Sequence, residues 1–262
     1  MSAPYRQDAG ALRFDWGLTG ATVIAEGAAV VVVVDLLSFT TSLSVAVDLG
    51  IEVYPYRLRD VSAAAFAATR QAVLAVGRRE AGNTGVSLSP LSIRAAAGRS
   101  GPLAGGGRLV LPSPNGASVA RALAEVGVSV VGASLRNVNA VAAWVRSAAA
   151  GQPVAVVASG ERWPGDLLRP AVEDLWGAGA VLSALLDAGA GPASPEAMAA
   201  VAAFLQVAGD LPAALRACAS GQELTADGFG DEIAVAAEWN TSTVVPVLQG
   251  DTFRAVRPAA VA

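Results

Sequence analysis

Residues 29–50, AVVVVVDLLSFTTSLSVAVDLG, decide the fold class of this chain. Val30–Val34 is an unbroken β-branched run with no polar face. Such a run predicts a strand buried on both sides, as in a parallel sheet covered by helices. Asp35 then stands at the carboxyl end of the strand, where open α/β sheets bind their ligands. A carboxylate at this position is interpreted as a metal ligand, a nucleophile or a helix cap.

The turn after Asp35 is rich in hydroxyl groups, and the following residues have helical spacing up to Gly50. Ser38, Thr40 and Thr41 are suited to binding a phosphate group or to capping that helix. The bland interpretation, a buried strand followed by a capped helix, and the functional one are equally compatible with this stretch.

Composition limits the class of protein and its partners. The 262 residues are 53% hydrophobic and 15% charged, which predicts a well-buried globular chain. A net charge of −4 argues against a nucleic-acid partner, because binding nucleic acid requires a basic surface. No leader-like beginning and no charge-free run of roughly 20 residues is found, so we expect a cytoplasmic protein without a membrane partner.

Two missing residue types and a single cysteine restrict the chemistry. The chain has no histidine, and its 18 arginines account for the whole Lys+Arg total, so lysine is absent too. Histidine triads, imidazole zinc sites, Schiff bases and the phosphate-loop lysine are therefore excluded. Cys218 is the only cysteine and has no partner for a disulfide within the chain, so core packing is its expected role.

Strand, polar turn and helix follow one another repeatedly. Repeats of this kind predict a mostly parallel or mixed sheet in three layers, and they gather the turns along one edge. The turns and the helix that follows the last of them contribute these candidate residues: Arg79 after the strand expected at 71–77, Ser113, Asn115 and Gly116 after 108–111, Ser134, Arg136 and Asn137 after 128–132, and Glu161, Arg162, Glu173 and Asp174 after 154–158. One crevice should therefore hold Asp35, Asn115, Asn137 and the Glu161 loop.

The rest of the chain is expected to belong to the same domain. Residues 1–28 are expected to form edge strands around turns at Gly17 and Gly20, and residues 29–190 are expected to form the α/β core. Residues 191–262 are expected to form a helical segment and strands that return to the sheet. The acidic residues at 231, 232 and 238 are interpreted as a solvated face, and the C-terminal helices as packing or subunit contact, compatible with a homodimer.

Five motifs in this order, VVVVVDLLSFTT, LSPLSI, PSPNGA, GASLRN and SGERWPGDLLRPAVEDLWGAGA, together resemble the 2-phosphosulfolactate phosphatase family of coenzyme M biosynthesis. The resemblance implies an α/β phosphatase that uses Mg²⁺ to hydrolyse a small phosphoester, phosphosulfolactate, to sulfolactate and phosphate. The chain departs from the family pattern in its polar loops. Ser38 stands where the family usually has an arginine, and Gly77-Arg78-Arg79 stands where the family has Gly-Glu-Arg. Leu88 replaces an asparagine of the family, and Pro114 replaces a threonine. These changes put the named substrate in question more than the fold.

Combined with the resemblance, the residues receive the following expected roles. Asp35, Glu161 and Asn115 are expected to be catalytic, with Glu161 or Glu80 orienting the water. Mg²⁺ accepts a few carboxylates and keeps several waters, so Asp35 with Asp174 or Glu173 would suffice, only one of the last two pointing into the site. The expected substrate-binding residues are Ser38, Thr40, Thr41, Arg79, Ser113, Gly116, Ser134, Asn137 and Arg162.

Two alternative functions remain. A phosphatase of the haloacid dehalogenase type would carry a second aspartate at the position of Leu37 and a lysine, and both are missing. The other alternative is a catalytically altered family member that binds a phosphorylated or sulfonated metabolite.

Overall fold

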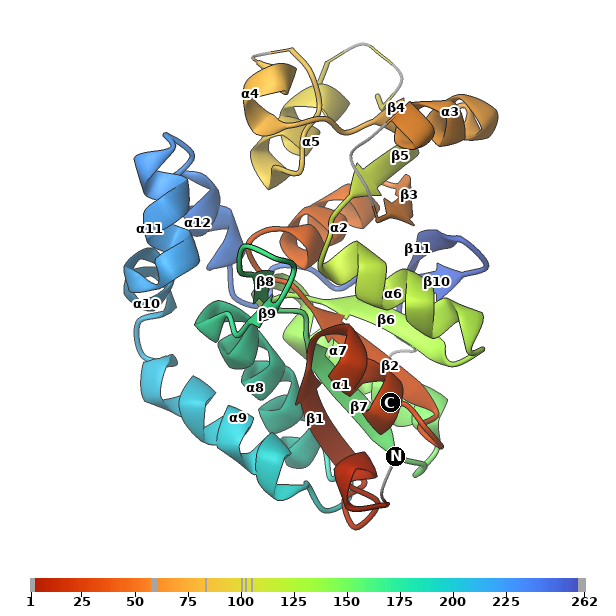
Figure 1. The fold of residues 1–262 in the computed structure, drawn as a ribbon, viewed down its shortest axis with the longest axis vertical. Coiled ribbons are helices and arrows are strands. Elements are labelled where there is room, and N and C mark those ends of the chain that lie inside the picture. The colour runs from red at the N-terminus through yellow and green to blue at the C-terminus, as the bar shows by residue number, and fades with distance from the viewer. Residues whose placement is uncertain are drawn as a thin grey trace.

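A nine-stranded mixed sheet with helices on both faces forms the protein in the computed structural model, which describes residues 3–57, 61–82, 84–99, 101, 103–104 and 106–258 (Figure 1). The order of the strands across the sheet is β1-β7-β2-β6-β10-β11-β3-β5-β4. They comprise β1 (Leu12–Trp16), β2 (Val30–Val34), β3 (Ile51–Tyr56), β4 (Val73–Leu74), β5 (Gly107–Pro112), β6 (Ser129–Ala133), β7 (Val154–Ala158), β10 (Val245–Gln249) and β11 (Thr252–Val256). The expected α/β class is confirmed.

Strand β2 lies between β7 and β6 and is parallel to both. Val30, Val32 and Val34 pack into one core, whereas Val31 and Val33 pack into the other. All five side chains are buried, because successive residues of a strand face opposite sides of the sheet and helices cover both of its faces. The first core is closed by α7 (Val138–Ala149), α8 (Val172–Asp187), α9 (Pro195–Val207) and α10 (Leu211–Ala217), and the second by α1 (Gly17–Ile24), α2 (Phe39–Asp48), α5 (Pro90–Ala97) and α6 (Gly116–Glu125).

Strands β10 and β11 make the sheet mixed. They form an antiparallel hairpin, and each also pairs antiparallel with its outer neighbour, Val247 with Val131 of β6 and Phe253 with Val53 of β3. The returning C-terminal strands expected from the sequence thus join two parallel groups of strands into one sheet.

Two segments differ from the sequence expectation. Residues 1–28 supply one edge strand, β1, and then helix α1, because Gly17 adopts a φ of +60° and the following apolar residues pack as a helix against α6. A short apolar run fits a helix or a strand equally well by periodicity. Residues 78–81, expected to be a loop, form the short helix α4 (Arg78–Ala81). Asp60 immediately precedes α3 (Val61–Arg70) and is by residue type a candidate cap for that helix, but it lies outside the described residues.

The carboxyl ends of β2, β6 and β7 lead into α2, α7 and a small hairpin at the same edge of the sheet. This hairpin consists of β8 (Glu161–Arg162) and β9 (Leu168–Arg169) and precedes α8. Strand β5 belongs to the other parallel group, and the turn after it, which leads into α6, meets the end of β2 through the hydrogen bond from Gly116 to Asp35. The remaining elements are η1 (Ala3–Arg6), η2 (Leu135–Asn137), α11 (Ala219–Ala226) and α12 (Glu232–Ala236). No single helix of the described chain has the length and apolarity to cross a membrane; α9 and α10 pass that test only as a pair bent by 106°.

Candidate active site

The carboxylate of Asp35 joins the beginnings of two helices. Its Oδ1 accepts a hydrogen bond from the backbone N–H of Phe39 in α2 (3.1 Å), and its Oδ2 accepts one from Gly116 in α6 (2.8 Å) and one from the Ser113 hydroxyl (3.3 Å). Helix N-termini favour negative charge, which explains why a carboxylate is tolerated at this depth. Burial nevertheless raises the pKa of Asp35 above its ordinary value, and the charge of Glu173 adds to the rise.

The hydroxyls of the turn after Asp35 are largely used by the turn itself. Thr40 Oγ1 donates to the carbonyl of Asp35 (2.8 Å) and accepts from its N–H (3.0 Å), and Thr41 donates to the carbonyl of Leu36 (2.8 Å). Ser38 is different, because its hydroxyl accepts a hydrogen bond from Arg78 (2.8 Å). A guanidinium therefore reaches the turn where the sequence has a serine in place of the arginine usual in the resembling family.

The first turn of α8 places two buried acids behind the strand ends. Asp174 accepts from the N–H of Leu36 through Oδ1 (2.8 Å) and from that of Gly160 through Oδ2 (2.9 Å), which ties the ends of β2 and β7 together. Its pKa is raised well above the ordinary value by burial and by the charges of Asp35 and Glu173. Glu173 lies beside Cys218, whose thiol pKa burial and this neighbouring carboxylate raise to about 12. The thiol therefore stays protonated near neutral pH.

Asn115 and the β8–β9 hairpin form the second part of the site. Asn115 Nδ2 donates to Glu161 Oε2 (2.9 Å), and Asn115 Oδ1 accepts from Arg162 Nε (3.1 Å). Burial raises the pKa of Glu161 to about 7, and the charge of Asp35 contributes next. Glu161 is thus poised to exchange a proton near neutral pH, as a general acid or base requires.

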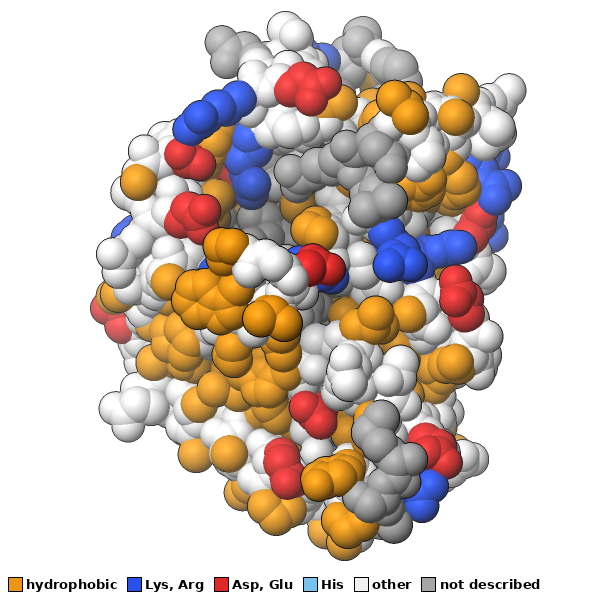
Figure 2. Space-filling model, viewed as in Figure 1, with side chains coloured by type: hydrophobic (Ala, Val, Ile, Leu, Met, Phe, Trp, Pro, Cys, Tyr) orange, Lys and Arg blue, Asp and Glu red, His pale blue; other side chains and the backbone are white. Residues whose placement is uncertain are grey.

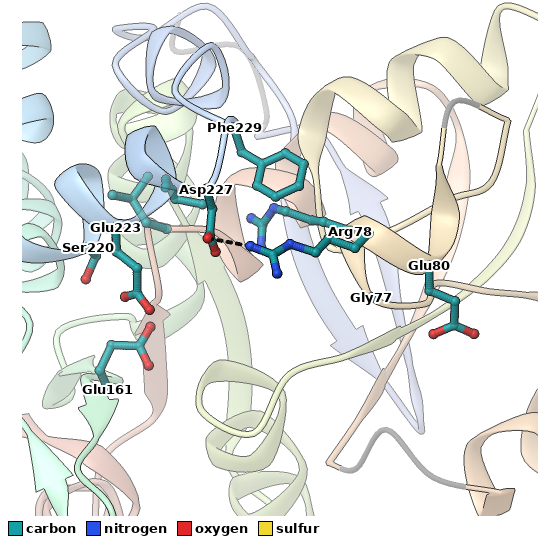
Figure 3. Close-up of a pocket in the computed structure, with 11 residues that line it drawn as sticks. Gly77, Arg78, Glu80, Glu161, Ser220, Glu223, Asp227 and Phe229 are labelled. Carbon is teal, nitrogen blue, oxygen red and sulfur yellow. Dashed lines mark hydrogen bonds and ion pairs between the residues drawn. The ribbon is translucent and has the colours of Figure 1, made fainter.

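A cleft of about 510 Å³ opens beside Glu161. Figure 3 shows Glu161 and Glu223 on one side and Arg78 on the other, and the surface between α4 and α11 carries basic and acidic side chains together (Figure 2). A second cavity of about 230 Å³ lies on another side of Glu161 and is also lined by Asn115 and Arg162. The first cleft is lined by Leu37, Gly77, Arg78, Arg79, Glu80, Glu161, Ser220, Glu223, Leu224, Asp227 and Phe229.

Both arginines of the cleft have acidic partners from the C-terminal helices. Arg78 binds Glu232 with Nε (3.1 Å to Oε1) and Nη2 (2.8 Å to Oε2), and its guanidinium lies 5.6 Å from the centre of the Phe229 ring. Arg79 pairs with Asp227 at 2.7 Å on the surface. The expectation of a solvated face at Glu232 is wrong, because this carboxylate is buried and held by Arg78.

Comparison with known proteins decides the family. The family model described as 2-phosphosulpholactate phosphatase matches residues 21–251. The chain belongs to the 2-phosphosulfolactate phosphatase family. It is also 30% identical, over 244 residues, to a probable 2-phosphosulfolactate phosphatase of Synechococcus sp. (strain WH7803), covering 88% of this chain and 92% of that protein. The resemblance drawn from the five motifs is confirmed.

Of the expected site residues, those that line the two cavities are Arg79, Asn115, Glu161 and Arg162, whereas the turn after β6 lies at the same edge as Asp35 but uses its polar side chains internally. Asn137 Oδ1 accepts from the N–H of Ser134 (2.9 Å), and Asn137 Nδ2 donates to the carbonyl of Val244 (3.2 Å). Arg136 is engaged with Asp48 (2.9 Å) and Glu238 (2.8 Å). None of Ser134, Arg136 and Asn137 lines either cavity beside Glu161.

Several residues of the cleft were not expected from the sequence. The helices that carry them were interpreted as packing elements, although Glu223 and Asp227 are four residues apart and therefore share one face of α11. That acidic face was the available signal. The unexpected cleft residues are Ser220, Glu223, Asp227 and Phe229, with Glu232 behind Arg78.

The acidic side chains of the site are the candidate ligands for a magnesium ion, which the family resemblance implies. In the part of the chain that the structure describes, no three acidic or sulfur side chains converge as an all-protein metal cage. Asp35, Glu161 and Asp174 are mutually repelling carboxylates with pKa values raised by burial, which a cation would relieve. Mg²⁺ is commonly bound through one or two carboxylates and several waters, so the residues fit such an ion.

Proposed function

We propose that this protein is a Mg²⁺-dependent phosphatase that hydrolyses a small phosphorylated acid similar to 2-phosphosulfolactate, giving the corresponding alcohol and phosphate. The observation that supports it most is Glu161: a carboxyl group with a pKa of about 7 on the wall of a 510 Å³ cleft, in a chain of this phosphatase family. An acid–base residue beside a cleft of this size suits a small substrate.

Asp35 and Asp174 are the side chains proposed to hold the ion, with Glu173 behind them. Asp35 Oδ1 and both oxygens of Asp174 each accept one backbone hydrogen bond and keep a further lone pair, whereas Asp35 Oδ2 already accepts two hydrogen bonds. When bound, Mg²⁺ would neutralise negative charge on the phosphoryl oxygens. The backbone hydrogen bonds hold both carboxylates in place before substrate arrives.

Glu161 is the proposed proton carrier. In hydrolysis a water oxygen bonds to phosphorus while the bond from phosphorus to the substrate oxygen breaks, and the departing oxygen takes up a proton. Protonated Glu161 can donate that proton, and its carboxylate form can instead orient the water. Asn115 holds the carboxyl group in place through the 2.9 Å hydrogen bond. Arg79, at the mouth of the cleft, is the proposed partner of a second anionic group.

A catalytically altered member that only binds a phosphorylated or sulfonated metabolite is the alternative. It is favoured by one observation: both arginines of the cleft are already paired with Glu232 and Asp227. For the same reason we expect 2-phosphosulfolactate itself to be a poor substrate, below about 10⁴ M⁻¹s⁻¹ in kcat/KM.

Phosphate release distinguishes the two functions. The purified protein is incubated with a panel of small phosphorylated acids, with Mg²⁺ or with a chelator. A phosphatase releases phosphate from at least one of them only when Mg²⁺ is present. Binding without release on every member of the panel would support the alternative.

A further inference from the structure

Asn115 occupies the N-cap position of α6 but makes no side-chain cap. Asparagine is among the residues most favoured at this position, because its side-chain oxygen usually accepts a hydrogen bond from the first turn. The N–H of Gly116, the first residue of α6, donates to Asp35 (2.8 Å), and no N–H of the first turn donates to the Asn115 side chain. The amide of Asn115 is therefore free for another purpose.

The two ends of that amide meet two consecutive residues of the hairpin. The oxygen accepts from Arg162 Nε (3.1 Å), and the nitrogen donates to Glu161 Oε2 (2.9 Å). A guanidinium has only donors, so it selects the amide oxygen and leaves the NH₂ group for the carboxylate. The side chain of Arg162 thereby sets the orientation of Asn115.

Arg162 is itself fixed by the protein. Its Nη2 donates to the carbonyl of Pro114 (2.8 Å), and its Nη1 is paired with Asp166 at the turn of the hairpin. All three nitrogens of the guanidinium thus have protein acceptors. This arrangement suits a side chain that holds its neighbours more than one that receives a substrate anion, the role expected from the sequence.

We propose that Arg162 is a positioning residue: it acts through Asn115 to determine which oxygen of Glu161 is tied down and which is left for the cleft. The inference rests on the proposed role of Glu161 in phosphoester hydrolysis. Figure 3 shows the Glu161 carboxyl group directed into the cleft, towards Glu223. With Oε2 held by Asn115, Oε1 is the oxygen that serves the substrate.

Loss of the guanidinium would release this constraint. The amide could then rotate by half a turn and present its oxygen to Glu161, so that two acceptors would face each other whenever Glu161 is ionised. The charged groups around Glu161 cannot replace the missing donor, because most are acidic; they are Asp35, Glu173, Asp174 and, with opposite charge, Arg169.

Steady-state kinetics of three variants test the proposal. In Arg162→Met we expect kcat to fall at least about tenfold while KM changes less than about twofold, because the interaction lost is not made with substrate. Arg162→Lys keeps a single donor nitrogen, so its kcat should lie between those of Arg162→Met and the wild type. Arg146→Met makes the same replacement at an exposed position of α7, away from Asn115, and should retain activity. A raised KM with unchanged kcat in Arg162→Met would instead show direct substrate contact and overturn the proposal.

Side-chain amide signals in ¹⁵N NMR give a readout that does not depend on turnover. The signals of Asn115 are identified by their loss in Asn115→Asp. We expect them to shift in Arg162→Met and to stay in place in Arg146→Met. Unchanged signals in a folded Arg162→Met protein would refute the positioning role, whereas shifted signals without any phosphatase activity would refute only the proposed function.

Discussion

Replacing Glu161 with glutamine should change how the stability of the protein depends on pH. The folded state raises the pKa of Glu161 from 4.5 to about 7. Between these two values Glu161 binds more protons in the folded protein than in the unfolded chain, so its contribution to wild-type stability falls as pH rises through this window and is constant above it. Glutamine has no charge to bury, and its amide oxygen can still accept the hydrogen bond from Asn115.

The expected difference follows from the size of the pKa change. At about 1.36 kcal/mol per pH unit the full effect is about 3 kcal/mol, and since Glu161 is only partly buried, about 1–3 kcal/mol is a realistic range. The unfolding free energy of Glu161→Gln should therefore equal that of the wild type near pH 4 and exceed it by about 1–3 kcal/mol at pH 8. Urea unfolding without divalent cations, repeated from pH 4 to 8, measures both curves. If the unfolding free energies of the two proteins changed in parallel with pH, the raised pKa of Glu161 would be refuted.

Three further outcomes are expected. Asp35→Asn should remove turnover and cost about 1.5–3 kcal/mol of stability, because an asparagine cannot accept from both Phe39 and Gly116; phosphate release and urea unfolding check this, and undiminished activity would exclude Asp35 from the site. Arg78→Ala should cost about 3–5 kcal/mol because it leaves Glu232 buried and unpaired, whereas the exposed-pair control Arg79→Ala should cost less than about 1 kcal/mol; equal losses in urea would contradict the burial of Glu232. Mg²⁺ at about 100 times its Kd should raise the unfolding free energy by about 2.7 kcal/mol in the wild type and much less in Asp35→Asn, and an equal rise in both would place the ion elsewhere.

Local sequence patterns predicted the centre of the fold well. Val30–Val34 could be assigned to a doubly covered strand because β-branched composition and the lack of a polar face both indicate it. Asp35 and Glu161 could be grouped because they follow two adjacent parallel strands, which end at one edge. Asn115 follows a strand of the other parallel group and joins them through its hydrogen bond to Glu161. Residues 17–24 could not be assigned, because a short apolar run has no decisive period.

The same polar turn can bind an anion or its own backbone, and the sequence does not distinguish the two. Ser134 and Asn137 bond each other and Val244, a partner more than a hundred residues away. Glu232 was likewise assigned to a solvated face, because its partner Arg78 lies 154 residues earlier and cannot be identified from local sequence. The role of Arg162 depends on Asn115 and Pro114, which only the packed hairpin brings within reach.

Phosphate release by the purified protein tests the central claim most directly. Wild type and Glu161→Gln are compared on 2-phosphosulfolactate and on other small phosphorylated acids, with Mg²⁺ and with chelator. We expect Mg²⁺-dependent release by the wild type from at least one of these acids, reduced about 100-fold or more in Glu161→Gln. Release by Glu161→Gln equal to that of the wild type, or no release by either protein from any of the acids, would contradict the proposed function.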